Sequence, residues 1–326
     1  MPAAAQQIAS AYRAPWWLPG GHAQTLCAAF LPPPRPALTR ERWDTPDGDF
    51  IDVDFAGEAQ AKRMLVLFHG LEGSSDSHYA RAVAKRAASR GWRCALPHFR
   101  GCSGEPNRLP RAYHSGDSDE IDWILRRLRD ARAAATDASE RLYAVGVSLG
   151  GNVLLKWLGE RGARAGELVR RAVAVSAPVD LAAAGHTLDR GFNRQLYTRA
   201  FLASMKRKAL AKLNRYPGLF DARRVVAART LYEFDELVTA PLHGFRSADD
   251  YWSRASSAPW LEAIRVPTLV LNARNDPFLP ADALVAATRR ASAEALLEFP
   301  ATGGHVGFPA RDDWLAQRVL EFLGRA

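Results

Sequence analysis

Gly146-Val147-Ser148-Leu149-Gly150 has the pattern Gly-x-Ser-x-Gly and stands where an apolar run gives way to a helical one. Residues 142–147 before it are typical of a buried strand, and residues 152–158 after it have the periodicity of a helix. A serine at such a strand–turn–helix bend is held in a strained conformation, with its hydroxyl above the sheet. Glycines flank it because side chains there would collide with the neighbouring strand and helix. We therefore predict Ser148 as a nucleophile.

Short apolar runs alternate with longer amphipathic ones on both sides of this bend. Apolar strands separated by helices indicate the α/β class, with a mostly parallel, doubly wound sheet. The predicted strands are 64–68, 92–96, 142–147, 171–176, 268–272 and 295–299, and the predicted helices outside the bend are 77–90, 117–135 and 314–323.

Residues 40–180 and 256–326 form the predicted core, which begins with a turn at Pro46-Asp47-Gly48. Asp-Gly between alternating segments predicts a hairpin, so the sheet is expected to begin antiparallel. The Pro-rich residues 1–39 are expected to lie on the core as an irregular arm. Residues 181–255 break the alternation with helical patterns, which favours a helical cap or lid over the strand ends rather than extra core helices.

A serine nucleophile needs a base, and the base needs an acid to orient it. In one class of α/β enzymes the chain order is serine, acid, histidine. Asp276 follows the strand 268–272, and His305 follows the last strand in a glycine-flanked loop. The predicted triad is therefore Ser148, Asp276 and His305. Asp180, after the strand 171–176, is the alternative acid.

The segment His69-Gly70-Leu71-Glu72-Gly73 follows the strand 64–68, where this class of enzyme supplies a backbone donor to an oxyanion. We expect the N–H groups of Leu71 and Leu149 to form the oxyanion hole. Such a donor is worth about 2.7–4 kcal/mol in the rate. His69 and Glu72 are expected to brace the loop rather than to react.

Composition excludes several other functions. The net charge is +9, from 44 Lys and Arg against 35 Asp and Glu, but the arginines are scattered and form no nucleic-acid-binding module. The odd cysteine count (Cys27, Cys94, Cys102) suits a reducing compartment. No motif for a metal or cofactor, signal peptide or membrane span of about 18 apolar residues is found. We expect a cytoplasmic protein without cofactor, metal or nucleic-acid partner.

Further motifs along nearly the whole chain resemble the YheT-like branch of the α/β-hydrolase superfamily. They are Trp17–Leu26, His69–Ser75, His98–Asn107, Tyr113–Gly116, Phe234-Asp235, His243–Phe245, Asp250-Tyr251 and Gly303–Phe308. Three residues, in two segments, depart from the branch. Gly20-Gly21 replace Asn-Pro in the first motif, and Asn275 stands where many members have Asp, which leaves Asp276 as the only acid in its loop.

The resemblance implies a serine hydrolase that cleaves carboxylic esters with short or medium acyl chains, or lipid-like esters, with Ser148, Asp276 and His305 as its triad. Acyl transfer or ester synthesis by the same triad is the nearest alternative. A non-catalytic ligand-binding protein on the same fold is another. Peripheral membrane contact through the basic, aromatic cap is a third. The sequence fixes neither the ester nor the oligomeric state.

Overall fold

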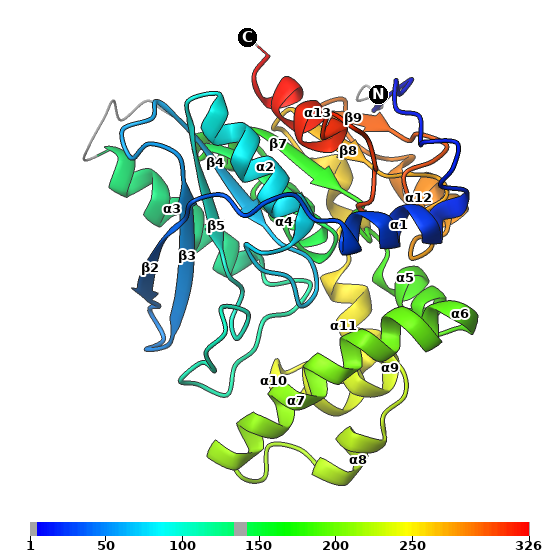
Figure 1. The fold of residues 1–326 in the computed structure, drawn as a ribbon. Coiled ribbons are helices and arrows are strands. Elements are labelled where there is room, and N and C mark those ends of the chain that lie inside the picture. Colours follow the sequence, from blue (N-terminus) through cyan, green and yellow to red (C-terminus); the bar gives the residue numbers. More distant parts are fainter. Residues whose placement is uncertain (1–4, 134–141, 326) are drawn as a thin grey trace.

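The computed structural model describes residues 5–133 and 142–325, which are built around a nine-stranded sheet (Figure 1). The strand order is β1-β9-β8-β7-β6-β4-β5-β3-β2. All paired strands are parallel except β3, which is antiparallel to both β2 and β5. The strands are β1 (Gln6–Ile8), β2 (Thr39–Asp44), β3 (Phe50–Ala56), β4 (Arg63–Phe68), β5 (Trp92–Pro97), β6 (Leu142–Val147), β7 (Val169–Val175), β8 (Thr268–Leu271) and β9 (Ala295–Glu298).

Helices cover both faces of the sheet, as the continuous apolar strands require. Alternate side chains of β4 enter two separate cores, because successive residues of a strand point to opposite faces. Val66 packs with α3 and α4, and Leu67 packs with α2 and α13. The core helices are α2 (His78–Ser89), α3 (Ser118–Ala133), α4 (Leu149–Arg161), α12 (Ala281–Thr288) and α13 (Trp314–Leu323), with 3₁₀ turns at Gly162–Glu167 and Ala258–Ala263.

These elements confirm the predicted α/β architecture, including the hairpin of β2 and β3. The predicted helix 117–135 corresponds to α3, and its expected last two residues lie outside the described residues. The same holds for residues 1–4 of the predicted arm.

The prediction that the N-terminal arm is irregular is wrong. β1 adds a parallel strand beside β9, and α1 (Gly20–Phe30) is a helix of 11 residues. Two glycines at its start and the Pro-rich segment after it hide the helical pattern, since both residue types disfavour a helix interior. The helix is stabilised by tertiary contacts instead, because it buries the polar side chains of Gln24 and Thr25 against the loops that follow β8 and β9.

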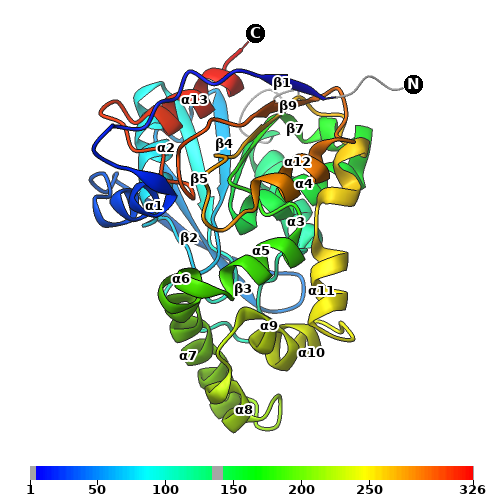
Figure 2. The same ribbon diagram turned by 90° about the vertical axis from the view of Figure 1, so that its right-hand side faces the viewer.

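Residues 181–255, which we call the helical insertion, contain no strand and extend beyond the carboxyl ends of the central strands (Figures 1 and 2). Their apolar side chains form a third cluster, which also includes Phe278 and Leu279. The helices are α5 (Leu181–Leu188), α6 (Gly191–Asn193), α7 (Arg199–Arg215), α8 (Ala222–Ala227), α9 (Leu231–Phe234), α10 (Ala240–Leu242) and α11 (Ala248–Ala255), with π-helical turns at Arg194–Thr198 and Asp235–Thr239. Among the helices described, none is long and apolar enough to cross a membrane.

Candidate active site

Ser148 stands in the sharp turn between β6 and α4, with φ 53° and ψ −121°. This is a strained conformation for a non-glycine residue. The glycines around it allow the turn to pack closely. A Cβ on Gly150 would lie 2.4 Å from the carbonyl oxygen of Phe68, and one on Gly146 would lie 2.4 Å from that of Gly150. The close packing at Gly146 and Gly150 therefore holds Ser148 in the sharp turn that the Gly-x-Ser-x-Gly pattern predicts.

The predicted triad residues lie within hydrogen-bond distance of one another. The Oγ of Ser148 is 2.9 Å from Nε2 of His305, and Nδ1 of His305 is 2.8 Å from Oδ2 of Asp276. The other carboxylate oxygen of Asp276 accepts the N–H of Phe278 at 2.8 Å. With an ionised Asp276, Nδ1 carries the proton, and Nε2 is left to accept the serine proton.

Asp180, the alternative acid, lies at the start of α5. Its side chain caps α5 by accepting the N–H of Ala183 at 3.0 Å. An acid at a helix N-cap stabilises the helix by satisfying a free backbone donor. The structure therefore brings together Ser148, His305 and Asp276 and gives Asp180 a different partner.

Two aromatic residues that the sequence did not single out fix the plane of the histidine ring. Phe278 stacks on His305 with ring centroids 4.1 Å apart and an interplanar angle of 28°. Tyr197, from the helical insertion, packs edge-on against Phe278 at 4.6 Å. The only sequence signal for Phe278 is its place two residues after Asp276. Tyr197 is 79 positions before that aspartate, so no local pattern indicates its role.

The loop after β4 lies directly against the serine. A Cβ on Gly70 would be 3.1 Å from the Cβ of Ser148, and Leu71 and Leu149 line the same cavity as Ser148. The N–H of Leu149 is the first of α4 and has no acceptor within the helix. For the N–H of Leu71, no acceptor occurs among residues 5–133 and 142–325. Neither amide has an acceptor within the part of the chain that the structure describes, so both can donate to a ligand.

His69 braces this loop as predicted. Its Nε2 accepts the N–H of Phe99 at 3.0 Å, so Nδ1 carries the proton and donates to the carbonyl of Gly70 at 2.7 Å. Burial lowers the pKa of His69 to about 3, because the charged form loses its hydration. His69 is thus a neutral structural residue at pH 7.

Glu72 braces the loop from the other side, and its backbone is strained at φ 55°. The hydroxyl of Tyr113 accepts the N–H of Glu72 and donates to its carboxylate, both at 2.8 Å. The ammonium of Lys208, on α7 of the helical insertion, lies 2.8 Å from the same carboxylate. Glu72 therefore links the loop to both the core and the insertion.

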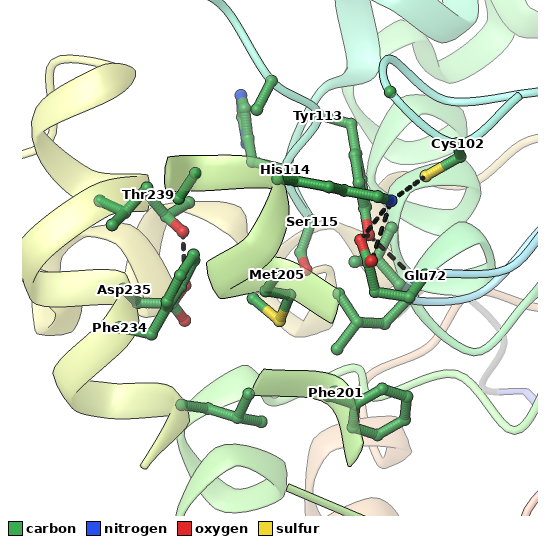
Figure 3. A pocket seen from close by; sticks show the side chains of 18 of the residues that line it. Glu72, Cys102, Tyr113, His114, Ser115, Phe201, Met205, Phe234, Asp235 and Thr239 are labelled. Carbon is green, nitrogen blue, oxygen red and sulfur yellow. Dashed lines mark hydrogen bonds and ion pairs between the residues drawn. The ribbon is translucent and has the colours of Figure 1, made fainter. Parts of the chain in front are cut away.

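A cavity of about 490 Å³ opens from Ser148 between the core and the helical insertion. Figure 3 shows Met205 in its middle with Phe201 below, Glu72 with Tyr113 and Cys102 at one end, and Asp235 with Thr239 at the other. Its lining is mostly apolar, and the insertion supplies Leu181, Leu188, Phe201, Met205, Phe234 and Val238. Apolar cavities of this size bind small organic ligands.

Asp235 is a buried carboxyl in this wall. It accepts the hydroxyl of Thr239 at 2.6 Å and the indole N–H of Trp252 at 2.8 Å. Burial raises the pKa of Asp235 to about 6, because the ionised form is poorly solvated there.

The chain is similar to enzymes of known families. Residues 63–311 match the sequence profile of the family described as alpha/beta hydrolase fold. YheT of Escherichia coli (strain K12), whose name is that of an esterase, is 40% identical over 296 residues, which cover 87% of this chain and 84% of that protein. Phospholipase ABHD3 of Mus musculus is 27% identical over 301 residues, 90% of this chain and 72% of that protein.

A solved structure has the same fold. An esterase from Exiguobacterium antarcticum matches with a TM-score of 0.57 at 16% identity, over 87% of this chain and 99% of that one.

Proposed function

This chain belongs to the YheT-like branch of the α/β-hydrolase family and is a carboxylic ester hydrolase, and on that premise we propose that it works through Ser148, His305 and Asp276. The observation that carries the proposal is the continuous series of hydrogen bonds from Asp276 through His305 to Ser148. A nucleophile, a base and an acid in this order are what acyl transfer to serine requires.

In the first half of the proposed reaction, Nε2 of His305 takes the proton of Ser148 while Oγ attacks the ester carbonyl carbon. The carbonyl oxygen becomes an anion and accepts the N–H groups of Leu71 and Leu149. The imidazolium is stabilised by the carboxylate of Asp276. Nε2 then returns its proton to the leaving alcohol as the C–O bond breaks, and an acyl-enzyme on Ser148 remains.

In the second half, His305 takes a proton from water, and the resulting hydroxide equivalent attacks the acyl carbon. The same two amides hold the second oxyanion. Its collapse breaks the bond to Oγ, which recovers a proton from Nε2 of His305. The carboxylic acid leaves, and the site returns to its starting state.

The substrates we propose are esters with short or medium acyl chains, or lipid-like esters. The apolar wall of the cavity supports this class, because each buried CH₂ group contributes about 0.8 kcal/mol to binding. The name of the mouse relative, a phospholipase, is consistent with lipid-like esters. We further propose that the helical insertion acts as a lid, since it supplies much of the wall above Ser148.

The test is turnover of p-nitrophenyl butyrate by Ser148→Ala. We expect the rate to fall by at least about 10³-fold, since the variant has no nucleophile. Ser89→Ala, at an exposed position at the end of α2, is the matched control and should retain the wild-type rate. Undiminished turnover by Ser148→Ala would refute the proposed mechanism. A fluorophosphonate probe should label the wild type and not the variant, whereas a non-catalytic binding protein would not be labelled.

Acyl transfer remains the second candidate, because an alcohol could intercept the same acyl-enzyme. Turnover with added ethanol separates the two: hydrolysis alone yields butyric acid, and acyl transfer also yields ethyl butyrate. We expect the acid as the main product.

A further inference from the structure

The loop that carries His305 has an unusually strained backbone. Four of the six residues 303–308 have positive φ, with Gly303 at 151°, Gly304 at 63°, Val306 at 56° and Phe308 at 40°. For valine and phenylalanine this region is costly, because their side chains crowd the backbone there. Such a loop persists only when the surrounding structure fixes it. The residues that fix it also determine where His305 lies.

Consecutive backbone amides of this loop are each held by a different side chain. The pairs are Gly303 N–H with Oε1 of Gln24 at 2.8 Å, Gly304 N–H with Oδ1 of Asn275 at 3.0 Å, His305 N–H with Oγ1 of Thr25 at 2.8 Å, and Val306 N–H with Oγ of Ser176 at 3.1 Å. Two of these acceptors come from α1, far away in the sequence. The N-terminal helix is therefore part of the support of the catalytic loop.

Gln24 connects the two loops of the proposed triad. Besides the N–H of Gly303, its Oε1 accepts a hydrogen bond from Nδ2 of Asn275 at 2.9 Å, and Asn275 precedes Asp276. Its Nε2 donates to the carbonyl of Leu18 at 2.8 Å, which fixes the orientation of the amide. The residue Gln24 is 1% exposed. All its hydrogen bonds therefore act without competition from water.

Thr25 holds the histidine itself. Its hydroxyl donates to the carbonyl of Gly21 at 2.7 Å, so a lone pair of the oxygen is left to accept the N–H of His305. The residue is buried, and a Cβ on Gly304 would approach its Oγ1 to 2.7 Å.

The backbone of α1 also touches both loops, which accounts for glycines at the contact. A Cβ on Gly21 would lie 1.9 Å from the carbonyl oxygen of Asn275. One on Gly307 would lie 2.4 Å from the carbonyl oxygen of Gln24. Gly21 departs from the motif of the YheT-like branch, and the sequence alone does not explain why. In this structure close packing requires a glycine there.

We propose that Gln24 and Thr25 are positioning residues of the active site, which set the separation of the histidine and acid loops that proton transfer from Ser148 needs. This proposal rests on the proposed function, since it assigns a task only if His305 is the base. Neither residue lines the cavity, so neither contacts substrate. They act through the backbone of His305 and through Asn275.

The experiment compares Thr25→Val with Thr25→Ser on p-nitrophenyl butyrate. Valine keeps the shape of threonine but loses the acceptor, whereas serine keeps the hydroxyl. We expect Thr25→Val to lower kcat by roughly 10- to 100-fold with little change in KM, because small displacements of a catalytic group are that costly. Labelling by the fluorophosphonate should slow in parallel. Thr25→Ser should restore most of the rate, and Thr39→Val, at an exposed position of β2, should match the wild type.

Equal kcat for Thr25→Val and Thr25→Ser would overturn the proposal, and so would a loss confined to KM. If Thr25→Val fails to fold, Gln24→Leu gives the same test, because it removes the acceptor for the N–H groups of Gly303 and Asn275. We expect the same reduction of kcat. An unchanged kcat would overturn the proposal. Failure of the proposed function can be distinguished from failure of the positioning role, because only the former appears as retained turnover in Ser148→Ala. An inactive Ser148→Ala with a fully active Thr25→Val rejects the positioning role alone.

Discussion

The ammonium of Lys208 on α7 lies 2.8 Å from the carboxylate of Glu72, the residue that follows Leu71 in the loop after β4. The Glu72 side chain is 8% exposed, and that of Lys208 is 33% exposed. The ion pair therefore joins the helical insertion to the loop that carries a proposed oxyanion donor. We therefore expect a displacement of α7 to affect the position of Leu71 through this contact.

Lys208→Met should destabilise the protein by about 1–3 kcal/mol, because it leaves a buried carboxylate with fewer partners while solvent screens part of the loss. It should also lower kcat, since Glu72 then holds the loop less firmly. Urea denaturation and ester turnover measure the two effects. In a double-mutant cycle with Glu72→Gln, the second change should cost less in the Lys208→Met background. Strict additivity would contradict the coupling, and Arg199→Met, at an exposed position of α7, is the control.

The identity of the acid can be tested with a pair of amide variants. Asp276→Asn should lower kcat by roughly 10³- to 10⁴-fold, because the amide no longer stabilises the imidazolium and favours the wrong tautomer of His305. Asp180→Asn should retain turnover and stability, since asparagine caps a helix about as well as aspartate. The reverse result in an ester assay would make Asp180 the acid.

Asp235 should make stability depend on pH. Its pKa of about 6 in the fold is above the ordinary value of about 3.9 for an unfolded chain, so the folded protein retains a proton that the unfolded chain releases between these values. The stabilisation is complete below about pH 4 and is lost as the pH rises through 6. Asp235→Asn does not titrate, and its amide can still pair with Trp252 and Thr239.

The stability of Asp235→Asn relative to the wild type should therefore increase from pH 4 to pH 8, by roughly 3 kcal/mol at most. Urea denaturation at several pH values measures this difference. Asp282→Asn, at an exposed position of α12, should show no such increase. A difference that stays constant with pH would mean that burial does not perturb the Asp235 carboxyl.

The parts of the site that the sequence could predict are those with local signals. The glycines around Ser148 and the apolar runs of β6 and β8 are short patterns whose steric reasons are contained within a few residues. Asp276 and His305 could be assigned because chain order and strand ends fix their places on a parallel sheet. The structure then brings these residues within hydrogen-bond distance.

What the sequence could not predict depends on contacts between distant segments. α1 was missed because its stability comes from Gln24 and Thr25 packing on loops about 250–280 positions away. The contact of Lys208 with Glu72 joins positions 136 apart, and no periodicity reports such a pairing. The same is true of Tyr197, which reaches the histidine through Phe278.

Met205 lies in the middle of the cavity wall (Figure 3), on α7, so its size should help to set the length of the accepted acyl chain. Met205→Trp replaces a flexible side chain by a larger, rigid one and narrows the cavity. We expect kcat/KM for p-nitrophenyl esters to fall steeply with increasing chain length, while the butyrate ester is hydrolysed at close to the wild-type rate.

Ala203→Trp adds the same ring at an exposed position of α7 and should leave the chain-length profile unchanged. Because an enzyme discriminates between substrates by their kcat/KM ratios, the profile separates a change of pocket shape from a general loss of activity. A uniform decrease across the series would show instead that acyl chains bind away from Met205.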